Sequence, residues 1–255
     1  MQARIVSFAS GLRWLLDGWR MFRAAPLGWL ALVLAYWLLM TVISLVPLAG
    51  IVAACMLVPA FSVGFMAAGR AASHGGPVTP ALLFDGFRHG ASAQIALGAV
   101  YLACLALVLS GSALADGGAL ARWMLTGRRP DEATLQSEDF YAALGAAAAL
   151  YTPVMMMFWF APPLAAWHSS SAVKSLFFSF FACLMNWRAF LAYGALTALV
   201  MLAVPLLALS ALLLASGGAL QLPVAGLVFP LLVVLLPTLF ASFYASYRDV
   251  FGAAP

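Results

Sequence analysis

Long apolar segments alternate with short polar ones along almost the whole chain. Six uncharged runs approach or exceed the length that a helix needs to cross the hydrocarbon core of a bilayer, about 20 residues. They cover residues 27–46, 51–68, 94–115, 140–164, 189–215 and 222–244. Because unpaired backbone groups are costly in lipid, α-helices are the expected spanning structure. The pattern therefore predicts an all-α, polytopic membrane bundle with six spans.

The six spans are expected to pair into three helical hairpins, and two of the connections contain turn-forming residues. Pro47, Ala49 and Gly50 separate the first two runs, and a Ser-Gly-Gly turn at residues 216–218 separates the last two. Such residues favour tight turns because they stop a helix or adopt conformations that other residues avoid. We expect the first pair of spans and the last pair to be hairpins with very short loops.

A threefold pattern overlies these hairpins. The sequence LDGWR at residues 16–20 precedes the first span, and FDGFR at residues 84–88 precedes the third; FSFF at residues 178–181 is a looser counterpart without the acid and the arginine. A second marker is a proline in each even span, followed eleven residues later by a cation: Pro59 and Arg70, Pro163 and Lys174, Pro237 and Arg248. Recurrence at matched spacing predicts a single integral membrane domain built from three units, residues 1–70, 71–165 and 166–255.

The segments outside the spans include two aromatic stretches with helical spacing. Apolar residues recur on one face of the first stretch: Ile5, Phe8, Leu12, Leu15 and Trp19. The second stretch covers residues 171–187 and follows serines that are able to cap a helix. Two interpretations fit this periodicity: the helices lie in the headgroup layer, or they buttress the spans.

Composition and charge agree with a membrane protein and suggest its orientation. Hydrophobic residues make up 65% of the chain and charged residues 8%, whereas soluble domains have about 25% charged residues. Nine of the 12 Lys and Arg residues lie on the same predicted side as the N-terminus, and the other three lie among five acids on the opposite side. Because cations favour the cytoplasmic side, both termini are expected in the cytoplasm.

The spans themselves offer little chemistry. None of the six contains Asp, Glu, Lys, Arg or His, which argues against ion- or proton-coupled transport. Met155–Met157, His168 and Cys183 suggest copper ligands, but successive helical residues point about 100° apart and cannot converge. No catalytic triad or phosphate loop is visible. We therefore expect no catalytic residue, no cofactor and no metal, and a protein that is not an enzyme.

Three motifs at the predicted cytoplasmic edge carry a family resemblance. They are LFDGFR at residues 83–88, ACLMNW at 182–187 and YASYRDVF at 244–251. With them the whole chain resembles an uncharacterised family of six-span bacterial inner-membrane proteins. More loosely, it is similar to the membrane domain of some glycerophosphodiester phosphodiesterases. The family resemblance implies a multi-pass protein of the inner membrane and brings no activity or functional residues with it.

These observations lead to two functional hypotheses. The first is a non-enzymatic scaffold or envelope factor, with membrane lipids and another membrane or cytoplasmic protein as partners and no role in nucleic-acid binding. Its expected working surface is a basic cytoplasmic rim: Arg13, Arg20, Arg70, Arg88, Lys174, Arg188 and Arg248. The alternative is a transporter or channel for a neutral or lipid-like solute. In that case, helix breaks at Pro59, Pro163 and Pro237 are candidates for lining its path.

Overall fold

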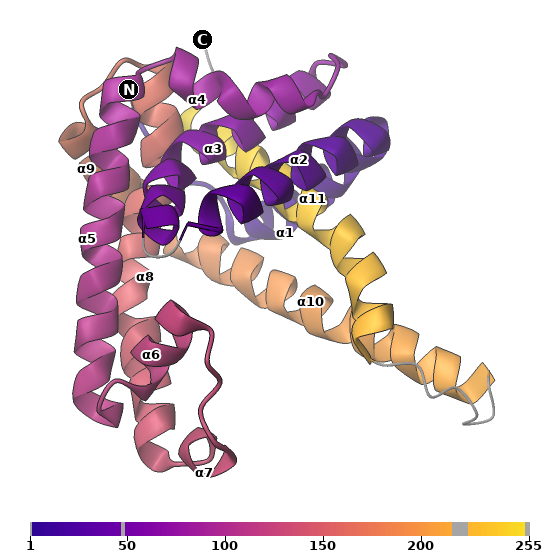
Figure 1. Ribbon diagram of the computed structural model, residues 1–255. Coiled ribbons are helices and arrows are strands. Elements are labelled where there is room, and N and C mark those ends of the chain that lie inside the picture. Colours follow the sequence, from indigo (N-terminus) through magenta and orange to yellow (C-terminus); the bar gives the residue numbers. More distant parts are fainter. Residues whose placement is uncertain (1, 47–48, 216–223, 253–255) are drawn as a thin grey trace.

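The regular elements of the protein are helices throughout the residues that its computed structural model describes, 2–46, 49–215 and 224–252 (Figure 1). They are α1 (Phe8–Ala24), α2 (Pro26–Ser44), α3 (Ala49–Ser73), the 3-10 helix η1 (Pro80–Phe84), α4 (Asp85–Arg88), α5 (Ala91–Asp116), α6 (Ala119–Thr126), α7 (Glu132–Leu135), α8 (Glu138–Trp167), α9 (Ala172–Met185), α10 (Trp187–Ala215) and α11 (Val224–Phe251). The predicted all-α class is confirmed.

Five of these helices are long and apolar enough to cross a membrane: α2, α3, α5, α8 and α10. They coincide with the first five predicted spans. The sixth predicted span, residues 222–244, falls on α11 apart from its first two residues, which lie outside the described residues. The turns expected at Pro47 and at residues 216–218 also lie outside them, so the sixth span stays a prediction.

Serine caps fix where two of the central helices begin. The Ser137 hydroxyl accepts a hydrogen bond from the backbone N–H of Phe140 at 3.2 Å, and two acids follow in the first turn of α8. The Ser171 hydroxyl accepts from the backbone N–H of Lys174 at 3.4 Å and starts α9. Both caps satisfy N–H groups that the helix itself leaves unpaired. The cap predicted before α9 is thereby confirmed.

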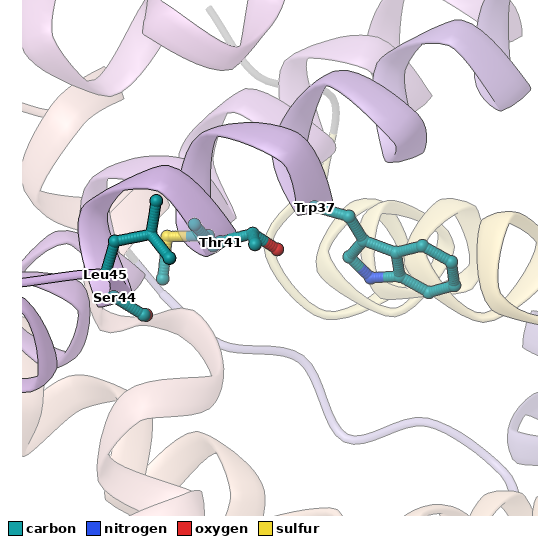
Figure 2. Close-up of a pocket in the computed structure, with 5 residues that line it drawn as sticks. Trp37, Thr41, Ser44 and Leu45 are labelled. Carbon is teal, nitrogen blue, oxygen red and sulfur yellow. The ribbon is translucent and has the colours of Figure 1, made fainter.

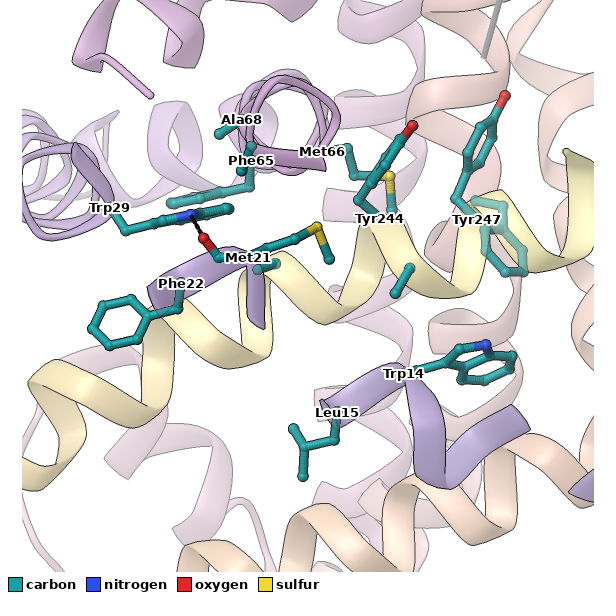
Figure 3. Close-up of a cluster of buried hydrophobic side chains, with 14 of the residues drawn as sticks. Trp14, Leu15, Met21, Phe22, Trp29, Phe65, Met66, Ala68, Tyr244 and Tyr247 are labelled. Atoms are coloured by element: carbon teal, nitrogen blue, oxygen red, sulfur yellow. Dashed lines mark hydrogen bonds between the residues drawn. The ribbon is translucent and has the colours of Figure 1, made fainter. Parts of the chain in front are cut away.

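The three helices that carry the repeated prolines, α3, α8 and α11, meet through aromatic side chains. Phe65 of α3 stacks on Phe240 of α11 with ring centroids 4.0 Å apart. Trp159 of α8 lies 4.8 Å from Phe243, and its indole N–H donates to the Ser246 hydroxyl at 3.1 Å. Figure 3 shows part of the same cluster, including Trp14, Trp29, Tyr244 and Tyr247. The centre is therefore filled by large side chains.

Short helices surround this centre, and each packs on a hairpin that it does not immediately precede in the chain. η1 and α4 pack on α3 and α2, and α9 packs chiefly on α8. α1 packs on α11 and α10, at the other end of the sequence. We call this part the convergent end: α1, α4, α9 and the last turns of α3, α8 and α11. The hairpins α5/α8 and α10/α11 diverge from it (Figure 1).

The three repeated prolines do not break their helices, so the candidate helix breaks at Pro59, Pro163 and Pro237 are corrected. α3, α8 and α11 are each continuous across them. Side-chain donors bond backbone groups nearby: the Ser62 hydroxyl donates to the Pro59 carbonyl at 2.7 Å, and the buried Gln94 amide donates to the Pro162 carbonyl at 2.9 Å. Proline is tolerated inside membrane helices, and here it does not interrupt them.

A second helix supplies a further partner beside Pro163. The Ser179 hydroxyl of α9 accepts from the backbone N–H of Phe160 at 2.9 Å and donates to the carbonyl of Met156 at 2.7 Å. In a regular α-helix, these two backbone groups, which are four residues apart, bond each other directly. Here the Ser179 hydroxyl lies between them and bonds both. α9 is thereby bonded to the backbone of α8.

The apolar stripe predicted for α1 is not its packing surface. Leu15 is buried, but Ile5, Phe8, Leu12 and Trp19 are exposed. The buried face of α1 consists of Ser10, Gly11, Trp14, Leu15, Gly18, Met21 and Phe22. α1 therefore buttresses two other helices with one face and presents an apolar second face outward, as the headgroup interpretation requires.

Candidate functional site at the convergent end

All seven cations of the predicted rim lie on elements of the convergent end or on the first turn of α10. Five are exposed: Arg13, Arg20, Arg88, Lys174 and Arg188. Arg70, near the end of α3, and Arg248, near the end of α11, are half-buried. The rim that was inferred from topology is thus a set of residues on adjoining elements, and its members differ in what they contact.

Two of these cations share one carboxylate of α1. Arg20 and Arg248 both pair with Asp17, at 2.9 Å and 2.8 Å. Arg20 lies three residues from Asp17 on the same helix, whereas Arg248 reaches it from α11. The indole N–H of Trp14 also donates to Asp249 at 2.9 Å. Asp17 and Asp249 are therefore anchors between α1 and α11, which leaves Arg248 a structural role.

Three other cations lie beside aromatic rings. The Arg70 guanidinium is 4.9 Å from the centroid of Trp167, and that of Arg188 is 5.5 Å from the centroid of Trp187. The ammonium of Lys174 is 5.9 Å from the ring of Phe178. Cation–π attraction acts within about 6 Å. Aromatic rings next to cations are also typical of the interface between lipid and water.

The glycines of the two DG motifs make equivalent close contacts. A β-carbon on Gly18 would overlap the carbonyl oxygen of Thr238, and one on Gly86 would overlap that of Ala60. Thr238 and Ala60 are the residues directly after the repeated prolines of α11 and α3. The first two copies of the motif therefore dock at the same place on their proline-bearing helices.

The third unit departs from this arrangement. Its short helix, α9, contacts the backbone of α8 through Ser179 and not through a glycine. Arg70 and Arg248 lie near the ends of α3 and α11, but Lys174 lies beyond the end of α8, in the first turn of α9. The equal spacing of the three cations therefore does not give them equivalent positions. The division into three units stays a prediction.

Asn186, between α9 and α10, is a site residue that sequence reasoning missed. It is 2% exposed, and its side-chain oxygen accepts from the backbone N–H of Val6 at 2.7 Å. Its amide nitrogen donates to the carbonyl of Arg4 at 3.0 Å. The N-terminal segment is thereby held against the convergent end. The sequence showed Asn186 only as part of a resemblance motif, and nothing in it indicated a partner about 180 residues away.

An aromatic cluster with polar atoms fills the space between the last turns of α8 and α11. The hydroxyl of Tyr247 lies 2.8 Å from the Nε2 atom of His168. Burial lowers the pKa of His168 below its usual range, which favours the neutral ring. The Tyr244 hydroxyl and the Trp167 indole nitrogen are buried without a hydrogen-bond partner among the described residues. The cluster therefore adds no further positive charge at neutral pH.

Two hollows on the surface of the protein are lined by different helices. One, of about 390 Å³, is lined by Trp37, Met40, Thr41, Ser44 and Leu45. Figure 2 shows its labelled residues along one segment, from Trp37 in α2 to Leu45 directly after the end of that helix. The other, the lateral groove, has about 500 Å³ and lies between α8, α9 and α10. Its lining includes Met155, Trp159, Cys183, Trp187, Leu191 and Gly194.

The lateral groove was not foreseen, because its walls come from three helices with no shared sequence signal. It includes two of the methionines and the cysteine weighed as copper ligands, Met155, Met156 and Cys183. Within the described ranges, no three His, Cys, Asp or Glu side chains gather as a metal site requires. The groove is an apolar surface next to the rim.

Comparison with known proteins identifies a relative of the chain. It is 42% identical, over 99% of its own length and 94% of the relative's, to a protein of Burkholderia thailandensis named as a probable inner membrane protein. The chain belongs to the family of this inner-membrane protein. No family model matches it, and no solved structure matches it. The looser likeness to the glycerophosphodiester phosphodiesterase membrane domain finds no support in these comparisons.

As a member of this family, the protein is a multi-pass component of the inner membrane. Its long apolar helices agree with the relative's name. The exposed apolar side chains of α2, α5, α8 and α10 then face lipid, which solvates them as water does not.

Proposed function

We propose that this inner-membrane protein is a non-enzymatic scaffold or envelope factor whose rim binds the anionic headgroups of phospholipids. The observation that carries the proposal is the set of exposed cations at the convergent end: Arg13, Arg20, Arg88, Lys174 and Arg188. They lie on or beside short helices with outward apolar faces. Each cation near an anionic membrane surface contributes about 1 kcal/mol to binding.

We further propose that the convergent end faces the cytoplasm. Nine of the 12 Lys and Arg residues belong to this end or its flanking segments, whereas the region of α6 and α7 contains Arg122, Arg128 and Arg129 together with most of the acids. Cytoplasmic segments carry the excess of cations in inner-membrane proteins. A green fluorescent protein fused to the C-terminus should be fluorescent, and an alkaline phosphatase fused there inactive; active phosphatase would reverse the orientation.

The packed centre supports a scaffold over the transporter or channel alternative. Trp14, Trp29, Tyr244 and Tyr247 are fully buried where the proline-bearing helices meet. Those helices also run through their prolines without a break. A solute path along the centre would need an opening that these side chains fill. The lateral groove lies at the side of the bundle, among exposed residues such as Leu191.

The rim proposal is tested by removing charge at one end and then at the other. The test variant is Arg13→Gln/Arg88→Gln/Lys174→Gln, which leaves Asp17 and its partners unchanged. The control is Arg122→Gln/Arg128→Gln/Arg129→Gln, which removes the same charge from the opposite end. Native mass spectrometry in micelles with equal phosphatidylglycerol and phosphatidylethanolamine measures the lipids that stay bound.

We expect the test variant to lose at least about tenfold in phosphatidylglycerol affinity, because three contributions of about 1 kcal/mol are removed. The control should retain the lipid as the unmodified protein does. Equal retention by both variants would contradict the rim proposal.

A further inference from the structure

The lateral groove has the walls of an acyl-chain site. Its volume, about 500 Å³, is within the range of about 300–1,000 Å³ found for small-molecule sites. Met155 and Trp159 come from α8, Cys183 from α9 and Leu191 from α10. α8 and α10 are both candidate membrane spans. What surrounds the groove in the membrane is therefore the hydrocarbon of lipids.

Two of the polar side chains in these walls are already hydrogen-bonded. The Thr152 hydroxyl donates to the carbonyl of Ala148 at 2.8 Å on its own helix. The Trp159 indole N–H donates to Ser246 at 3.1 Å. Burial raises the pKa of the Cys183 thiol, which stays neutral. A polar solute in the groove would lose its hydration and find few partners, so the mostly apolar walls favour an apolar occupant.

The mouth of the groove carries the opposite chemistry. Trp187 lines the groove at the first residue of α10, and the guanidinium of the exposed Arg188 lies 5.5 Å from its ring. An arginine next to a tryptophan at the end of a spanning helix is placed at headgroup level. Its guanidinium binds phosphate with a fork of N–H donors. An anionic headgroup at Arg188 and a chain along Leu191 fit one molecule.

Gly194 gives the groove room along α10. A β-carbon there would meet no atom within 4 Å. Gly145, farther along α8 from the convergent end, is equally open and does not line the groove. The two positions differ in location and not in their tolerance of a side chain. They therefore provide a matched pair for blocking the groove.

We infer that the lateral groove holds one acyl chain of an anionic phospholipid, with the headgroup phosphate at Arg188. This inference rests on the proposed function, since it names a specific lipid site next to the rim. The rim alone would bind a changing set of headgroups. The groove adds one retained lipid whose chain lies between α8 and α10.

The test uses the full-length protein and phosphatidylglycerol as the probe, with phosphatidylethanolamine as competitor, followed by native mass spectrometry. We expect one strongly retained phosphatidylglycerol in the unmodified protein. Gly194→Trp should lower its affinity at least about tenfold, because the burial of several methylene groups is lost. Gly145→Trp should not change it. Arg188→Gln should reduce the preference for phosphatidylglycerol over phosphatidylethanolamine.

Retention of phosphatidylglycerol by Gly194→Trp at the level of Gly145→Trp would overturn the inference, as would equal binding of the two lipids by the unmodified protein. Gly194→Leu, a smaller obstruction, replaces Gly194→Trp if the larger side chain prevents folding. The two proposals fail separately. If Arg13→Gln/Arg88→Gln/Lys174→Gln loses lipid and Gly194→Trp does not, the rim proposal is supported and the groove inference is contradicted. If only Gly194→Trp loses lipid, the rim proposal alone is contradicted.

Discussion

The short helices α1 and α9 are both aromatic, both lie outside the spans and both pack at the convergent end, but they are held in different ways. α1 lies between α10 and α11 and buries Trp14 against Phe190, with ring centroids 5.2 Å apart. α9 lies mainly along α8 and buries small residues: Ser175, Ser179, Ala182 and Cys183. Its phenylalanines Phe177 and Phe181 stay exposed.

The difference shows two ways to bring a helix close to a neighbouring backbone. α1 does so by the absence of a side chain at Gly18, against the carbonyl of Thr238. α9 does so with a hydroxyl, because Ser179 bonds both Met156 and Phe160. The first contact depends on space and the second on hydrogen bonds. Substitutions should therefore affect them by different amounts.

The largest expected effect comes from Gly18→Leu. The new side chain would overlap the backbone of α11, which cannot move aside, so α1 would be displaced from its site. Overpacking costs about 1–3 kcal/mol, and a clash with backbone lies at or above the upper end. Thermal unfolding of the detergent-solubilised protein measures the loss. Gly145→Leu, where a β-carbon meets no neighbour, should be almost neutral; similar losses would show that α1 is not held by this contact.

A smaller effect is expected from Ser179→Ala. It leaves the N–H of Phe160 and the carbonyl of Met156 without their bridging partner, at a cost of about 1–3 kcal/mol. Amide hydrogen exchange at Phe160 should become faster. Ser210→Ala is the control, because that hydroxyl bonds only the Leu206 carbonyl of its own helix and is exposed. Unchanged exchange at Phe160 would mean that α8 closes its own hydrogen bond there.

The smallest effects concern the two arginines on Asp17. Arg20→Gln should change stability by less than about 0.5 kcal/mol, because an exposed pair on one helix contributes little. Arg248→Gln should cost about 1 kcal/mol, since its half-buried pair joins α11 to α1. The comparison is best made at low and high salt, where the exposed pair is screened more strongly. If Arg20→Gln cost more stability than Arg248→Gln, the ion pair within α1 would contribute more than the pair that joins α1 to α11, contrary to this prediction.

The short helices also show how far sequence reasoning reaches. The aromatic periodicity of residues 4–22 correctly indicated a helix, but it favoured the exposed stripe through Phe8 and Leu12. In water the apolar face of a helix is buried, whereas in lipid a large apolar face can point outward. Trp14 and Gly18 form the packing face because of what lies on α10 and α11. The lateral groove was missed for the same reason.

The sequence by itself determined the first five spans, because each depends on about 20 consecutive apolar residues and on nothing distant. It also determined the cap of α9 and the gathering of cations at one end. Only the tertiary structure decided that α1 packs on the last hairpin, that the prolines leave their helices unbroken and that Asn186 holds the N-terminal segment. Each of these depends on contacts between residues far apart in the chain, and local patterns do not encode the partner.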